Sequence, residues 1–286
     1  MFMRCLLVPT ATGRDTTHRL DAALKLSKRL HAHVDVLFVS PDAESLLAAL
    51  PAAAVASGIT LEALQSDAAA TAAAGKASLE EWCLKSSVGT VPSAERLDAT
   101  FASWREEVGD LETIVALAGR VSDLIIIDRP SSNGPFSETI FDAAVFSTGR
   151  PALMVPTTLP YDLLSHVAIA WNGTLEAARV VGESIALLHE ADRVSIIRAH
   201  GRDGDETRLA DLAGYLRWHG IVANELSVKA SADKTAGEAI LEEVDRIDAS
   251  MLLMGAYTHS RIRQFLLGGV TREVLAKARI PVLMTH

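Results

Sequence analysis

Short apolar runs alternate with longer segments of helical periodicity along the whole chain. The runs end in turn residues, as at residues 34–39, and such runs are typical of buried parallel strands. Between them, apolar residues recur every three or four positions, as at residues 20–30, which is typical of helices that cover a sheet. Strands that alternate with helices favour a parallel sheet with right-handed crossovers. We therefore expect an α/β protein.

The same order of segments occurs twice. Expected strands cover residues 5–8, 34–39, 101–104, 123–127 and 152–155, then 167–170, 194–197, 222–228, 251–254 and 281–284. Expected helices cover residues 20–30, 46–50, 61–84, 114–121 and 140–146, then 177–188, 208–218, 236–247 and 262–278. In each copy the fourth strand leads through a turn and a helix into a fifth strand that is entered through proline, at Pro151 and Pro281. Self-similarity of this kind indicates an internal repeat.

The length of 286 residues suits two domains of ordinary size. The boundary is expected near Pro160, which gives a first domain at residues 1–160 and a second at residues 161–286. The first domain is longer, and its additional residues lie between its second and third strands, at positions 41–91.

Composition limits the partners that the chain can have. A formal net charge of −9 disfavours nucleic acid and anionic membrane surfaces, since both carry negative charge. No apolar run is long enough to span a bilayer. Cys5 and Cys83 form neither a metal-binding nor a redox motif. These features predict a cytoplasmic protein without nucleic-acid or membrane partners.

The segment that follows the strand at residues 251–254 has the residues of an anion site. Gly255 follows that strand, and Gly268 and Gly269 stand before the helical run that begins at Val270. Backbone N–H groups at a helix start bind anions when no side chain covers them. The alternative that this segment is an ordinary loop without a ligand stays open, because glycine pairs also occur in such loops between a strand and a helix.

This segment resembles the nucleotide loop of universal stress proteins, which reads G-x2-G-x9-G-(S/T) between a strand and a helix. Gly255 stands at the first glycine, Thr258 replaces the second, and nine residues separate Thr258 from Gly268. Gly269 replaces the Ser/Thr, and a Pro-Val-Leu strand follows at residues 281–283. The resemblance implies two Rossmann-like domains of the adenine nucleotide alpha hydrolase-like type, each with a five-stranded parallel sheet flanked by helices. It also implies ATP or another adenine nucleotide, together with Mg, as the cofactor.

The resemblance extends to the first and second strands of the second copy. Family members end the first strand with Asp, where this chain has Asn172, and they contact the base at the position of Ala199. Asn172 lacks the charge of Asp and would hold a metal more weakly; its alternative role is a turn or cap before the helix near Thr174. No catalytic and no metal residue is assigned. The expected nucleotide-binding residues are Asn172, Ala199, Met254, Gly255, Thr258, Gly268, Gly269, Val270 and Thr271.

The first copy lacks most of these features. Ala11 stands at the Asp position, Asp128 at the position of the first glycine, and Glu138 and Thr139 at the glycine pair. Carboxylates at these positions would repel a polyphosphate. We therefore expect that the first domain does not bind ATP and that it serves as a fixed partner of the second.

The family resemblance implies an ATP-binding stress-response or regulatory protein. One alternative is an interaction module without a nucleotide, and a weaker one is an enzyme on a related α/β fold, with at most slow ATP hydrolysis. No Walker A, Gly-x-Ser-x-Gly or His-Glu-x-x-His motif occurs, and no Gly-x-Gly-x-x-Gly follows the first strand of either copy. Family members usually associate through their last strands. We expect the two domains to pair in this way as a pseudo-dimer, and a homodimer of two such chains is an alternative that the sequence leaves open.

Overall fold

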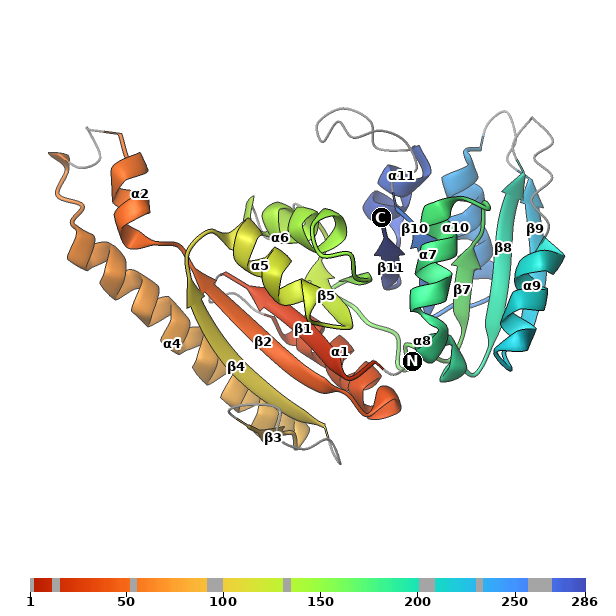
Figure 1. Cartoon of the computed structure of the whole chain (residues 1–286), viewed down its shortest axis with the longest axis horizontal. Coiled ribbons are helices and arrows are strands. Elements are labelled where there is room, and N and C mark those ends of the chain that lie inside the picture. Colours follow the sequence, from red (N-terminus) through yellow and green to blue (C-terminus); the bar gives the residue numbers. More distant parts are fainter. Residues whose placement is uncertain are drawn as a thin grey trace.

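One mostly parallel sheet runs through the whole molecule (Figure 1). The computed structural model describes residues 3–11, 16–51, 56–91, 100–130, 135–200, 209–229, 234–256 and 269–286. The sheet has eleven strands in the order β3-β4-β2-β1-β5-β6-β11-β10-β7-β8-β9. Helices flank it, which confirms the expected α/β class.

The first half of the chain supplies one end of the sheet. Its strands are β1 (Cys5–Thr10), β2 (His33–Ser40), β3 (Gly89–Thr90), β4 (Phe101–Val108), β5 (Leu124–Asp128) and β6 (Ala152–Val155). Its helices are α1 (Thr17–Leu30), α2 (Ala43–Ala49), α4 (Leu61–Ser86), α5 (Leu111–Arg120) and α6 (Pro135–Phe146). The two-residue β3 extends the five expected strands at the edge, and it pairs in parallel with β4.

The second half supplies the other end. Its strands are β7 (Val167–Ala170), β8 (Val194–His200), β9 (Ala223–Lys229), β10 (Met251–Gly255) and β11 (Val282–Thr285). Its helices are α7 (Leu175–Glu183), α8 (Ile185–His189), α9 (Leu209–Trp218), α10 (Ala236–Arg246) and α11 (Gly269–Lys277). The prediction of one continuous helix at residues 177–188 was wrong, because the structure divides this segment at Ser184 into α7 and α8. The backbone N–H of Ser184 is shared between the carbonyls of Val180 and Val181, as in a tightened last turn.

Strands β6 and β11 join the two halves, and they form the one antiparallel pair among the described strands (Figure 1). Leu153 lies opposite Leu283, and Met154 lies opposite Val282. Successive side chains alternate between the faces of a sheet, so the leucine pair enters the core on one face and Met154 and Val282 enter the core on the other. All four side chains are fully buried. The expected pairing of the last strands is therefore present within the chain.

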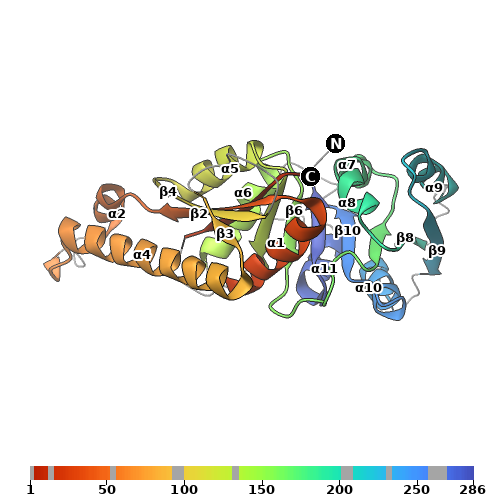
Figure 2. The same cartoon turned by 90° about the horizontal axis from the view of Figure 1, so that it is seen from below.

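The additional residues 41–91 of the first half form a helical arm. Figures 1 and 2 show α2 and the first part of α4 projecting beyond the end of the sheet. The later part of α4 packs on β2 and β4, where Leu79 and Trp82 are buried. A Cβ atom at Gly75 would lie 2.9 Å from the ring of Trp104, so this glycine allows the close approach of α4 to the sheet.

Ion pairs between α1 and the second half add a second connection. The guanidinium of Arg29 lies 2.9 Å from the carboxylate of Asp162 and 2.8 Å from that of Asp192. The hydrogen bond to Asp192 raises the pKa of Arg29 above its ordinary value. The ammonium group of Lys25 donates a hydrogen bond to the backbone carbonyl of Tyr161, with a donor–acceptor distance of 2.5 Å. These contacts hold α1 against the segment that follows β6.

Substitution of Arg29 by alanine tests this connection. Arg29→Ala is expected to lower the free energy of unfolding by about 1 kcal/mol or less, because partly exposed ion pairs contribute weakly. The loss should shrink as salt is added, since ions screen such pairs. Urea unfolding at low and high salt measures it. The exposed neighbour Lys28→Ala is the control, and an equal effect of both substitutions at low salt would contradict the assignment.

A glutamate beneath β11 makes stability depend on pH. Burial raises the pKa of Glu183, while a hydrogen bond from the Thr285 hydroxyl, 3.4 Å away, lowers it to a smaller extent. A raised carboxyl pKa means that the folded state disfavours the charged form, so stability is lost as pH rises through the pKa of the folded state.

Glu183→Gln should therefore increase the free energy of unfolding at neutral pH. The gain should vanish at about pH 4, where a glutamate begins to be protonated even in the unfolded chain. Urea unfolding at both pH values measures the difference. Glu80→Gln on the exposed side of α4 is the control, and a gain of equal size at both pH values would refute the role of Glu183.

Candidate functional site

The candidate site lies at the carboxyl ends of β7 and β10. Strand order reverses between these two strands, and open α/β sheets bind ligands at such a point. The strands pair directly, with Met254 opposite Ala170, so the segments that follow them start side by side. Gly255 ends β10, and Asn172 comes two residues after β7.

Asn172 holds the start of α7. Its Oδ1 accepts hydrogen bonds from the backbone N–H of Thr174, at 3.2 Å, and from the hydroxyl of Thr174, at 2.9 Å. Thr174 in turn caps α7 by accepting from the N–H of Ala177. Gly173 between them has a φ of 72°, which favours glycine. The turn role that the sequence left open for Asn172 is thus present in the structure.

Gly255 is required by the approach of α7 to the end of β10. A Cβ atom there would lie 2.6 Å from the backbone nitrogen of Ala177 and 2.8 Å from the carbonyl carbon of Glu176. Gly255 is the last residue of β10. Its missing side chain makes room for another part of the protein.

Among the described residues, no side chain covers the N-terminus of α11 at Gly269. The helix starts at Gly269, where an added Cβ would meet no atom within 4 Å, and its first turn contains no acidic residue. Val270 is half-buried and Thr271 is buried. The helix extends to Lys277, close to the end expected at residue 278.

The two other expected contact residues belong mainly to the core. Met254 is buried within one of the two apolar clusters, and Ala199, near the end of β8, packs against the same cluster. Only their backbones are therefore suited to a ligand. Thr258 and Gly268 lie outside the described residues, as do His259, Arg261 and Arg263. Within the described part of the chain, no group of three or more His, Cys, Asp or Glu side chains is arranged to hold a metal.

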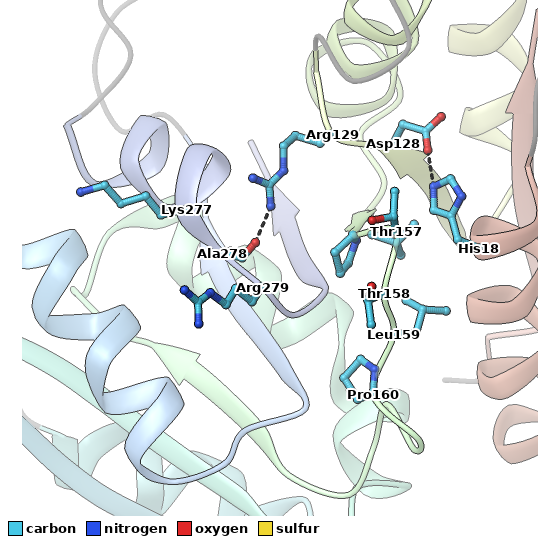
Figure 3. Close-up of a pocket in the computed structure, with 12 residues that line it drawn as sticks. His18, Asp128, Arg129, Thr157, Thr158, Leu159, Pro160, Lys277, Ala278 and Arg279 are labelled. Atoms are coloured by element: carbon cyan, nitrogen blue, oxygen red, sulfur yellow. Dashed lines mark hydrogen bonds and ion pairs between the residues drawn. The ribbon is translucent and has the colours of Figure 1, made fainter.

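The corresponding place in the first half contains an ion-paired carboxylate. Asp128 ends β5, and its Oδ1 lies 2.6 Å from Nε2 of His18 (Figure 3). Its Oδ2 lies 3.2 Å from Nε of Arg19. Arg19 and Asp128 are both buried. The partners of this carboxylate thus come from α1.

Sequence reasoning did not find His18 and Arg19. The available signal was a pair of basic residues in the first turn of the helix after β1, the place that faces the end of β5 in this strand order. Glu138 lies exposed in the first turn of α6, so this helix start carries a negative charge where α11 carries none.

Comparison with known proteins places the second half in a family. The model of the universal stress protein family matches residues 165–286, which contain β7 to β11. Residues 165–286 are thus similar to the universal stress protein family.

Relatives extend the likeness. Universal stress protein Slr1230 of Synechocystis sp. is 25% identical over 169 residues, which are 56% of this chain and 57% of that protein. The match thus covers little more than half of the relative's length. A universal stress protein of Archaeoglobus fulgidus shares the fold over 99% of this chain and 96% of its own, with a TM-score of 0.73 and 17% identity. A putative universal stress protein of Pseudomonas aeruginosa does so over 98% and 92%, with a TM-score of 0.56 and 16% identity.

The first half therefore shares the fold of these structures, although the family model itself covers only the second half. Among the residues with a described position, no helix combines the length and the apolar character that crossing a membrane requires.

Two glycine substitutions at the candidate site distinguish a tightly packed position from one with free space around it. Gly255→Ala is expected to lower the free energy of unfolding by about 1–3 kcal/mol, the usual cost of overpacking, because its Cβ would collide with the backbone of α7. Gly269→Ala should leave stability unchanged or raise it by less than about 1 kcal/mol, because its surroundings are open. Urea unfolding of both variants measures this. Equal destabilisation by the two substitutions would contradict the close contact at Gly255.

Proposed function

We propose that the second half binds an adenine nucleotide, ATP, and that the chain is a nucleotide-responsive protein of stress response or regulation. The observation that carries the proposal is the start of α11. Gly269 is open to solvent and directly follows Gly268, and no acidic side chain lies in the first turn. Helix starts of this kind favour phosphate through their free N–H groups and the positive end of the helix dipole.

The residues near this helix start fit a nucleotide in part. Backbone groups at Gly269 and Val270, with Gly268 and Thr258 of the preceding loop, would hold the phosphates. The carboxyl end of β8, at Ala199, would lie toward the base of the nucleotide. Gly255, Thr271 and Met254 are further expected nucleotide-binding residues. The side chain of Met254 lies in the core, so Met254 would contribute its backbone.

The metal is the weaker part of the fit. Mg would enter with the phosphates and supply positive charge. Asn172 is uncharged, and its Oδ1 is engaged with Thr174, so it offers little to the ion. We propose no catalytic residue for this protein.

The first half is proposed to have no ATP site. Asp128 is held between His18 and Arg19 at the end of β5, and Glu138 places a carboxylate in the first turn of α6. One site per chain follows. We retain residues 1–160 and 161–286 as two domains that imitate a dimer, in a cytoplasmic protein.

An interaction module without a nucleotide is the second candidate function. The observation that favours it is the engagement of Asn172, whose side-chain oxygen already accepts two hydrogen bonds within the turn. ATP would then meet one polar side chain fewer at this edge of the sheet. The titration below distinguishes the two functions.

Calorimetric titration with Mg-ATP, after removal of any bound nucleotide, tests the proposal. Wild type should bind close to one ATP per chain. Gly269→Asp should weaken binding by about tenfold or more, because it places a carboxylate against the phosphates. The fold should tolerate this change, since space is open at Gly269 and an acid suits a helix start.

Gly182→Asp on α7 is the matched control, because an added Cβ would meet no atom there either. It should leave ATP affinity unchanged. Equal affinities of Gly269→Asp and Gly182→Asp would exclude α11 as the phosphate site. Failure of wild type to bind millimolar ATP would support the interaction module.

A further inference from the structure

A cleft lies at the junction of the two halves, at the opposite end of α11 from its glycine start (Figure 3). Its volume is about 850 Å³. We call it the junction cleft, and its lining consists of His18, Asp128, Arg129, Val155, Pro156, Thr157, Thr158, Leu159, Pro160, Lys277, Ala278 and Arg279. It exists only because β6 and β11 pair, since each half supplies one wall. Nothing in the proposed nucleotide function uses it.

We propose that the junction cleft binds a small organic anion, one that joins a phosphate or carboxylate group to an apolar body. The inference does not depend on ATP binding by the second half.

The charges around the cleft favour an anion in a protein that is acidic as a whole. Among the described lining residues, Arg129, Lys277 and Arg279 contribute three cations, and Asp128 is the single carboxylate. That carboxylate is already paired with His18 and with the buried Arg19 behind it. The described lining itself therefore carries a net positive charge, and a partly enclosed positive site raises the local concentration of anions.

The three cations do not contribute equally. Lys277 is shared between Glu238 and Glu273 on the surface, so its field is largely neutralised. Arg129 donates to the backbone carbonyls of Ala276 and Ala278, which fixes its guanidinium at the wall of the cleft. This fixed position makes Arg129 a preorganised anchor for an anion.

Arg279 supplies the adjustable charge. It is exposed, and within the described part of the chain it takes part in no hydrogen bond or ion pair. Figure 3 shows its side chain turned away from His18, toward α10. Glu238, Glu242 and Asp245 line a smaller cavity of about 270 Å³ on that side. Because Arg279 forms no pair there, rotation toward a bound anion breaks no contact.

The remaining lining sets the chemical class of the ligand. Thr157 and Thr158 add hydroxyl groups, whereas Val155, Leu159 and the two prolines add apolar surface. Pockets of 300–1,000 Å³ with an apolar lining and a few polar groups typically take organic molecules of moderate size. A bare inorganic ion would leave most of this cleft unfilled.

Ligand-observed NMR with simple probes tests the proposal on the full chain. Phenyl phosphate and benzoate carry an anionic group on an apolar ring, benzyl alcohol is the neutral analogue, and inorganic phosphate lacks the ring. Wild type should bind phenyl phosphate or benzoate at millimolar concentration and should bind benzyl alcohol much more weakly. The preferred anion distinguishes a phosphate ligand from a carboxylate ligand.

Arg279→Gln should weaken binding of the preferred probe by about tenfold, the expected effect of losing one charge-assisted contact. Arg272→Gln, on the exposed side of α11 and outside the lining, should leave it unchanged. Thermal unfolding of both variants verifies that they remain folded. The proposal fails if wild type binds neither phenyl phosphate nor benzoate, or if inorganic phosphate is the one probe that binds. It also fails if benzyl alcohol binds as tightly as the organic anions, or if both arginine variants bind the preferred probe like wild type.

Discussion

The antiparallel pairing of β6 with β11 determines how the whole chain is arranged. Three residue pairs join two parallel half-sheets, and the side chains on both faces are buried in cores that continue from one half into the other. An unpaired edge strand exposes backbone groups that favour aggregation. The pairing removes two such edges at once. Because it is antiparallel, it also turns the carboxyl edges of the two half-sheets in opposite directions.

That geometry places the two potential ligand regions apart from each other. The crevice between β7 and β10 opens at one end of α11, and the junction cleft lies at the other end, where β6 leaves the sheet beside the entry to β11. Arg129 extends from the end of β5 to the backbone carbonyls of Ala276 and Ala278, at the C-terminal end of α11. The helix is thus contacted by the first half at its end and carries the glycine pair at its start.

The two halves use the same strand order for different chemistry. At the end of β5, the carboxylate of Asp128 is matched by His18 and Arg19 from α1. At the end of β10, Gly255 has no side chain, and α7 approaches until its backbone fills that space. One half therefore places an ion pair at the end of its switch-point strand, and the other has a helix start without an acidic residue in its first turn. This difference is the basis of the proposal that the chain has a single nucleotide site.

Much of the fold could be predicted from the sequence, because a short run of apolar residues by itself indicates a buried strand. The predicted strands agree with the observed ones closely, and the pairing of the last strands is present. The edge strand β3 was missed because Gly89 and Thr90 carry no apolar pattern, and the break at Ser184 depends on one shared hydrogen bond.

The candidate site was less predictable. His18 and Asp128 are 110 residues apart in sequence, so no local spacing reveals their contact. The close contact at Gly255 could not be read from the sequence, because the atoms that crowd it belong to α7, far away in the sequence. The junction cleft requires both halves in their folded arrangement, and neither half alone contains a motif for it.

Hydrogen–deuterium exchange with and without Mg-ATP tests the central claim, that one nucleotide site exists and lies in the second half. The account predicts slower exchange at the start of α11 and in the segment after β7, with no change in the first turn of α1 or at the end of β5. Slower exchange around His18 and Asp128, or in both halves equally, would contradict it.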